Sequence, residues 1–169
     1  HERRKIYSAG KSVYANLLGI AIEEGMLSSA DVRVSTVYPA MMDVPDGTGP
    51  KPRRYATDAD RDITFRQLIS NTSGYLKPNE KPGEVFHYQT FGMNILTHAL
   101  ASLYGYYDIE RDTDSPGIAK LVAEKIAAPI DAQFSYSYRN FDHAPEAKTN
   151  IFGNYTEIET DPYDAARLG

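Results

Sequence analysis

A helical run near the start of the chain constrains its fold more than any other segment. Between Lys11 and Glu24 the apolar residues recur at helical spacing: Val13, Leu17, Leu18, Ala21 and Ile22. Gly25 follows at the position where a helix commonly ends with a glycine. The pattern predicts a helix over 11–24 with one face on a core.

Ser8 and Lys11 lie where this helix begins. Residues three apart share a helix face, so the hydroxyl and the amine lie one turn apart. A nucleophile and its base need this geometry, because a partly desolvated lysine has a lowered pKa and can accept a serine proton. In the alternative interpretation Ser8 is a helix N-cap and Lys11 a solvated first-turn residue. The pair alone does not decide between them.

Two more helices with a clear apolar face are predicted downstream. Residues 93–103 place Ile95, Leu96, Ala99 and Leu103 on one side. Residues 117–128 point Ile118, Leu121, Val122 and Ile126 inward, and Pro129 stops the helix.

Shorter segments complete the predicted elements. A short helix over 63–69 is capped by Asp62 or Thr64 and ends in the polar turn 70–74. Alternating aromatic and polar residues predict a strand over 134–141, and residues 3–7 form an extended segment that leads to Ser8.

The connections between these elements are long. Residues 39–55 and 76–83 are loops rich in proline and other turn residues. In the connection 26–38, Leu27 and Val37 are expected to contact the core, and residues 161–168 have a helical pattern. Helices separated by long loops are typical of a helical subdomain that belongs with a sheet.

Composition excludes several classes of function. The net charge of -5 and pI near 5.3 argue against a nucleic-acid surface. No apolar run approaches the roughly 20 residues of a membrane span, and the first residues are not signal-like, so the compartment stays open. The chain has no Cys, and its four His, at 1, 87, 98 and 143, lack the spacing of a metal motif. We therefore expect no metal site.

Three segments together resemble the serine β-lactamase-like hydrolases, which include class C β-lactamases, penicillin-binding carboxypeptidases, esterases and amide hydrolases. The segment 6–27 is similar to the nucleophile helix of that family. Residues 63–75 are similar to its next helix and His-Thr-Ser-Gly turn, with Asn71 in place of the His. Residues 82–90 resemble the segment with the Tyr-x-Asn motif, and the three segments occur in the family's order and spacing.

The resemblance implies acyl transfer to water without a metal or organic cofactor, and it implies roles for four residues. Ser8 is the nucleophile that becomes acylated, Lys11 is its general base, and Tyr88 carries protons to the leaving group and to the deacylating water. Thr90 takes the substrate-binding position where the family usually has Asn, and its hydroxyl has a shorter reach than an amide. This departure favours an esterase or amide hydrolase over a true β-lactamase.

A further motif of the family, Lys-Thr-Gly or His-x-Gly on a strand facing the serine, is not found. The sequence Lys148-Thr149-Asn150 lacks the glycine that allows a close backbone approach. It precedes Gly153-Asn154-Tyr155-Thr156-Glu157, which resembles a mid-domain loop of the family. The motif is therefore expected beyond Gly169.

The predicted fold class is α+β, a β-lactamase/transpeptidase-like fold. Residues 1–169 are expected to be one partial domain, cut at both ends, that keeps the nucleophile helix and helical subdomain and lacks most of the sheet. The expected substrate is a small ester or amide, and the oligomeric state is not readable. The alternatives are a non-catalytic binding relative, and a helical interaction domain in which Ser8, Lys11 and Tyr88 do not converge.

Overall fold

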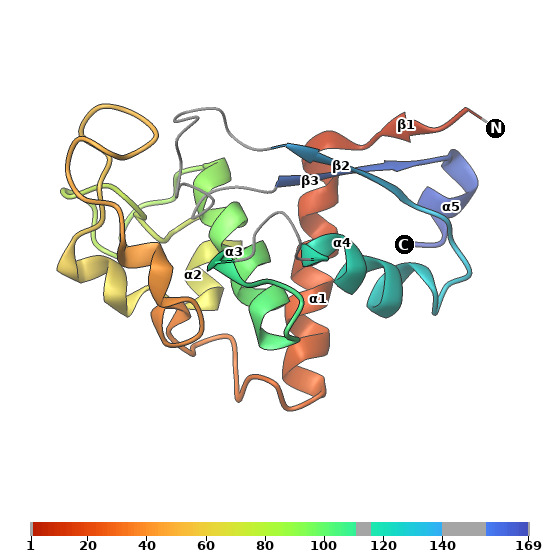
Figure 1. The fold of residues 1–169 in the computed structure, drawn as a ribbon, viewed down its shortest axis with the longest axis horizontal. Coiled ribbons are helices and arrows are strands. Elements are labelled where there is room, and N and C mark those ends of the chain that lie inside the picture. Colours follow the sequence, from red (N-terminus) through yellow and green to blue (C-terminus); the bar gives the residue numbers. More distant parts are fainter. Residues whose placement is uncertain (1, 111–115, 140–154, 169) are drawn as a thin grey trace.

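Helix α1 (Lys11–Glu23) runs through the middle of the computed structural model, which describes residues 2–110, 116–139 and 155–168 (Figure 1). The predicted helix over 11–24 is confirmed to within one residue. Four of its predicted core residues are buried and Ile22 is half-buried, while Tyr14, which the prediction omitted, is fully buried. Gly25 has a φ of 75°, so the helix ends at a left-handed glycine as expected.

Helix α2 (Phe65–Ile69) begins at Thr64, one of the two predicted caps. The Thr64 hydroxyl accepts a hydrogen bond from the Gln67 backbone N–H at 3.3 Å, and the Gln67 side-chain oxygen accepts one from the Thr64 N–H at 2.9 Å. This reciprocal capping box satisfies two N–H groups that the first turn leaves unpaired.

Helix α3 (Thr90–Leu103) begins three residues before the predicted start at 93. All its residues from Gly92 to Ala101 are buried, and Leu103 is only half-buried. The predicted apolar side is therefore in the core, as expected, and the other sides of α3 are enclosed by neighbours as well. Helix α4 (Gly117–Val122) continues into a π-helical turn (Ala123–Ala127) that ends before Pro129, as predicted.

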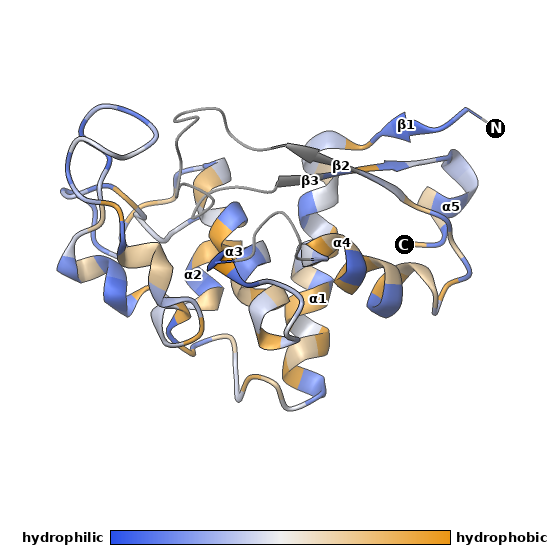
Figure 2. Ribbon diagram, in the orientation of Figure 1, coloured by the Kyte–Doolittle hydropathy of each residue, from blue (hydrophilic) through white to orange (hydrophobic). Residues whose placement is uncertain are grey.

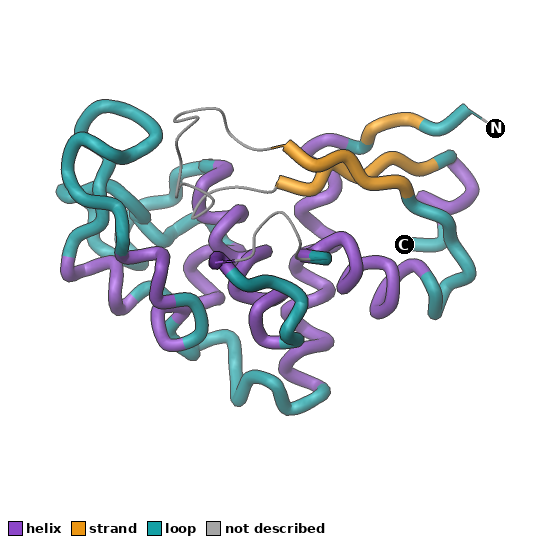
Figure 3. Tube along the Cα trace, viewed as in Figure 1, coloured by secondary structure: helices purple, strands orange, loops and turns teal. Residues whose placement is uncertain are grey.

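Three antiparallel strands form a small sheet in the order β1-β3-β2, lying across the N-terminal end of α1 (Figures 1 and 3). These strands are β1 (Arg4–Lys5), β2 (Ser135–Arg139) and β3 (Tyr155–Thr160). Helix α5 (Pro162–Ala166) follows β3 and is capped by the Asp161 side chain. The expected extended segments before Ser8 and after 134 are confirmed as strands.

The central strand β3 corrects the expectation of a loop for residues 155–157, while 153 and 154 lie outside the described residues. Four of the six residues of β3 are β-branched or aromatic, types that favour strands, so the loop expectation came from the family resemblance and not from local propensity. The stability of β3 comes from partners distant in sequence: Ile158 is buried in the core, and Glu157 pairs with Lys5 at 2.8 Å. Lys148-Thr149-Asn150 lies outside the described residues.

The segments before α2 contain short 3-10 helices over Val34–Thr36, Pro39–Met42 and Asp58–Asp62. The predicted loop 39–55 is thus helical in its first residues. Leu27 is buried, and Val37 is half-buried and packs against the core, so both expected core contacts are confirmed. Figure 2 shows apolar residues along α1 and α3 and polar residues in β1. In the described part of the chain, no helix combines the length and apolar character needed to cross a membrane.

Candidate active site

Ser8 lies in a 3-10 turn (Tyr7–Gly10) that joins β1 directly to α1. The Ile6 N–H donates to the Ile158 carbonyl on β3 at 3.0 Å, which fixes the start of the turn to the central strand. Tyr7 has a φ of 45°, a left-handed conformation that disfavours residues with a side chain. The chain thus turns sharply into α1 and leaves Ser8 exposed at the N-terminal end of that helix.

The side chains of Lys11 and Tyr88 both contact the Ser8 hydroxyl. Lys11 Nζ donates to Ser8 Oγ at 3.2 Å, and the Tyr88 hydroxyl donates to the same oxygen at 2.8 Å. Lys11 Nζ also lies 5.2 Å from the centroid of the Tyr88 ring. The interaction-domain alternative expects the three side chains to lie apart, and this geometry contradicts it.

The acidity of Tyr88 reflects these contacts. The Lys11 amine, and secondly the Ser8 hydroxyl, lower the pKa of the Tyr88 phenol from its usual 10.0, against the opposing effect of partial burial. A positive charge and a hydrogen-bond donor beside the oxygen both favour the phenolate. The phenol can therefore exchange a proton with Ser8 more readily than an isolated tyrosine.

Tyr88 lies on the segment that leads into α3, and the polar turn 70–74 holds this segment in place. The Gln89 side-chain amide donates to Ser73 Oγ at 3.3 Å and to the Tyr75 carbonyl at 3.5 Å. Asn71 contacts the residues on both sides of Tyr88. Sequence reasoning missed these contacts. An Asn in a polar turn signals a left-handed residue, but it does not reveal which later segment packs on the turn.

Thr90, the predicted substrate-binding residue, is the half-buried first residue of α3, directly after its N-cap Gln89. It is therefore close in the chain to Tyr88. Its role stays a prediction.

Exposed apolar side chains gather on the two segments that meet at Ser8. Six large apolar residues of the described chain are strongly exposed, and four of them belong to these segments. They are Tyr7 beside Ser8, and Val85, Phe86 and Tyr88 itself. Exposed apolar groups beside polar ones are typical of ligand-binding sites.

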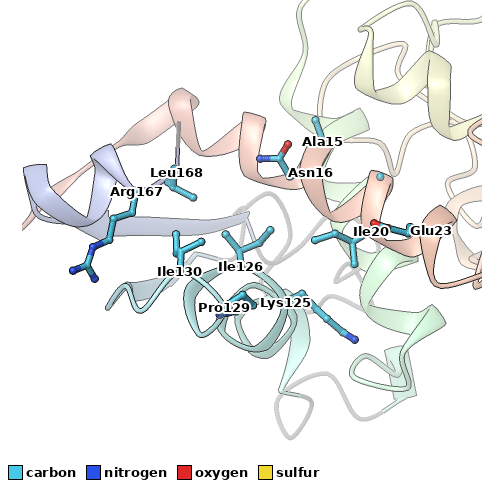
Figure 4. Close-up of a pocket in the computed structure, with 11 residues that line it drawn as sticks. Ala15, Asn16, Ile20, Glu23, Lys125, Ile126, Pro129, Ile130, Arg167 and Leu168 are labelled. Carbon is cyan, nitrogen blue, oxygen red and sulfur yellow. The ribbon is translucent and has the colours of Figure 1, made fainter.

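A groove of about 440 Å³ runs along another part of α1, between that helix, the π-helical turn and the C-terminal residues (Figure 4). Its lining includes Asn16, Ile20, Lys125 and Ile126, but none of Ser8, Lys11 and Tyr88. Within residues 2–110, 116–139 and 155–168, no three His, Asp or Glu side chains are placed to hold a metal ion.

The family model described as Beta-lactamase matches residues 1–131. The chain belongs to the beta-lactamase family. The resemblance drawn from the sequence is thereby confirmed. No curated protein matches this beta-lactamase family member.

Solved structures share its fold at low sequence identity. A D-stereospecific amidohydrolase from a Streptomyces species matches with a TM-score of 0.67 and 17% identity, covering 99% of this chain and 59% of its own. A class C beta-lactamase matches with a TM-score of 0.65 and 16% identity over 98% of this chain and 48% of its own. A penicillin-binding protein from Bacillus halodurans has a TM-score of 0.63 and 17% identity, covering 99% and 58%.

These likenesses confirm the predicted fold class, a β-lactamase/transpeptidase-like fold represented here by helices and a small sheet. The chain spans only about half to three fifths of the length of these solved proteins. Members of the beta-lactamase family are serine hydrolases that act on small molecules.

Proposed function

We propose that this protein is a serine hydrolase that cleaves a carboxylic ester or an amide through an acyl-enzyme on Ser8. One observation carries the proposal: two proton-transferring side chains from separate segments, Lys11 and Tyr88, meet at the Ser8 hydroxyl at 3.2 and 2.8 Å. A nucleophile in hydrogen-bond contact with its base is the arrangement that acyl transfer requires.

The reaction has two steps. In the first, Ser8 Oγ forms a bond to the substrate carbonyl carbon while its proton passes to Lys11, the general base. Tyr88 then delivers a proton to the departing alcohol or amine, the carbon–leaving-group bond breaks, and an ester of Ser8 remains. In the second step water attacks the carbonyl carbon of this ester while Tyr88 accepts a proton from the water. The bond between that carbon and Ser8 Oγ then breaks, Lys11 returns its proton to Ser8, and the acid leaves. The chemistry is balanced without a metal or an organic cofactor.

Thr90 is proposed to contact the substrate from the beginning of α3. A threonine hydroxyl reaches less far than the amide that the family usually has at this position. The proposal therefore favours simple esters and amides over β-lactams.

Covalent labelling of the natural full-length protein tests the assignment. A fluorophosphonate probe is expected to add one adduct, detected by intact mass, at Ser8. Ser8→Ala should abolish the adduct. Ser12→Ala is the matched control, because Ser12 also lies in the first turn of α1 but its hydroxyl donates to the Ala9 carbonyl at 2.7 Å.

Two outcomes would contradict the proposal. Equal labelling of the wild type and of Ser8→Ala would place the reactive group elsewhere. An absence of any adduct in the folded wild-type protein would favour the alternative, a non-catalytic beta-lactamase-like binding protein. Hydrolysis of p-nitrophenyl esters and of the matching anilides then separates esterase from amidase activity.

A further inference from the structure

We propose that Asn71 is a positioning residue for Tyr88: it binds the backbone on both sides of that tyrosine and so holds the phenol against Ser8. The Asn71 carbonyl accepts a hydrogen bond from the His87 N–H at 2.8 Å. Its side-chain oxygen accepts one from the Gln89 N–H at 3.3 Å. We call these two hydrogen bonds the Asn71 clamp. Its role in catalysis rests on the proposed function, whereas the two hydrogen bonds are present in the structure.

The backbone around Tyr88 explains why one residue can make both bonds. The two donors, the N–H groups of His87 and Gln89, are two residues apart with Tyr88 between them, and both bind acceptor atoms of Asn71. The N–H groups of 87 and 89 thus face one acceptor residue together, and the position of the Tyr88 Cα is fixed from both directions.

Asparagine suits this place for two reasons. Asn71 has a φ of 57°, and Asn tolerates the left-handed conformation better than most residues. Its side chain is short, so its amide oxygen stays close to its own backbone carbonyl. Two acceptors from a single residue can then serve two neighbouring donors.

The clamp is attached to a rigid support. The Asn71 N–H donates to the Leu68 carbonyl at 3.1 Å, and the Thr72 N–H donates to the Gln67 carbonyl at 2.9 Å, so the turn continues directly from α2. After the turn, Tyr75 is fully buried and its hydroxyl donates to the Met41 carbonyl at 2.7 Å. A reacting group is placed accurately only when its supporting residues are themselves fixed.

The test replaces the side-chain half of the clamp and leaves the backbone half. Asn71→Gly keeps the left-handed backbone and the carbonyl acceptor but deletes the side-chain oxygen. Asn71→Asp keeps an oxygen at the same place and is the rescue variant. Asn79→Gly, at an exposed position in the following loop, controls for added chain flexibility.

The readout is the titration of Tyr88, followed by NMR of ring-labelled tyrosine and assigned with Tyr88→Phe. We expect the pKa of Tyr88 to rise towards 10.0 in Asn71→Gly, because the phenol loses its fixed contacts with Lys11 and Ser8. The wild-type titration should persist in Asn79→Gly, and Asn71→Asp should lie closer to the wild type than Asn71→Gly does. A merely structural turn would change the melting temperature without moving this titration.

An unchanged Tyr88 titration in folded Asn71→Gly overturns the proposal. Should that variant fail to fold, Asn71→Ser takes its place, because its shorter side chain does not reach Gln89, and an unchanged titration there is equally decisive. The rate of fluorophosphonate labelling at Ser8 should also fall by about 10- to 100-fold in Asn71→Gly, as for a misplaced catalytic group. If Ser8 is never labelled while the titration moves, the clamp is supported and the proposed hydrolase function is refuted.

Discussion

Two glycines that share a left-handed backbone but differ in their surroundings offer a sharp test of the fold. Gly74, the last residue of the turn 70–74, has a φ of 62°, and a Cβ added there would lie 2.7 Å from the Glu80 carbonyl oxygen. Gly25, at the end of α1, has a φ of 75°, and an added Cβ would meet nothing within 4 Å. Alanine at either site must adopt the unfavourable left-handed backbone conformation. Only Gly74→Ala also brings a Cβ too close to a backbone atom, the Glu80 carbonyl oxygen.

The expected losses follow from these two contributions. The left-handed conformation costs an alanine about 1–2 kcal/mol, partly offset by the less flexible unfolded chain, so Gly25→Ala should lower the free energy of unfolding by about 1 kcal/mol. The clash at Gly74 involves a backbone atom that cannot rotate away, which adds about 1–3 kcal/mol. At about 2–4 °C per kcal/mol for a chain of this size, Gly74→Ala should melt several degrees below Gly25→Ala.

Urea unfolding followed by far-UV circular dichroism measures both variants against the wild type. The slope of the free energy against urea should stay the same, so that the difference in midpoint reports stability alone. Equal losses in the two alanine variants would refute the reasoning, because the approach of Glu80 to Gly74 would then have no energetic consequence. A smaller loss at Gly74 than at Gly25 would refute it still more strongly.

Three further changes probe the support and chemistry of the site. Lys5→Met leaves the buried carboxylate of Glu157 without its 2.8 Å partner. Since Lys5 is partly exposed, we expect a loss of about 2–3 kcal/mol in thermal unfolding, and a double variant with Glu157→Gln should recover part of it. Leu17→Ala opens a cavity at a side chain that is 1% exposed, so urea unfolding should show a loss of about 2–5 kcal/mol. The pKa of Tyr88 is lowered first by Lys11, so in Lys11→Met the Tyr88 titration followed by NMR should move to higher pH. Labelling of the serine, which loses its proposed general base in this variant, should fall by about 100-fold or more.

Local patterns in the sequence predicted the elements whose own residues show helical spacing, a cap or a helix-ending glycine. The run from Lys11 to Gly25 has both helical spacing and an end signal, and α1 forms there. Thr64 was one of two predicted caps of α2, and it caps that helix in the structure. Tyr88 was found through its resemblance to a family segment, because one tyrosine among 13 has no distinguishing local pattern.

Features that depend on distant partners were not predictable. The residues of β3 favour a strand, but the sequence does not show that it pairs with β1 and β2 from other parts of the chain. The apolar side of helix α3 was predicted, but the burial of Asn94, Thr97 and His98 on the rest of the helix was not. Polar residues inside a helix do not show from periodicity alone that neighbours enclose them.

The candidate site combines exposed reacting groups with buried supports. Ser8 and Tyr88 are open to solvent, yet the turn before α1 is fixed by the Ile6 N–H on the carbonyl of buried Ile158. The segment of Tyr88 is fixed by the turn that follows α2. Neither support touches a reacting atom, and each comes from a different part of the chain. A substitution that shifts β3 or the turn 70–74 should therefore separate Ser8 from Tyr88 without unfolding the protein. In such a variant, labelling at Ser8 should be lost at a lower denaturant concentration than the helical circular dichroism signal.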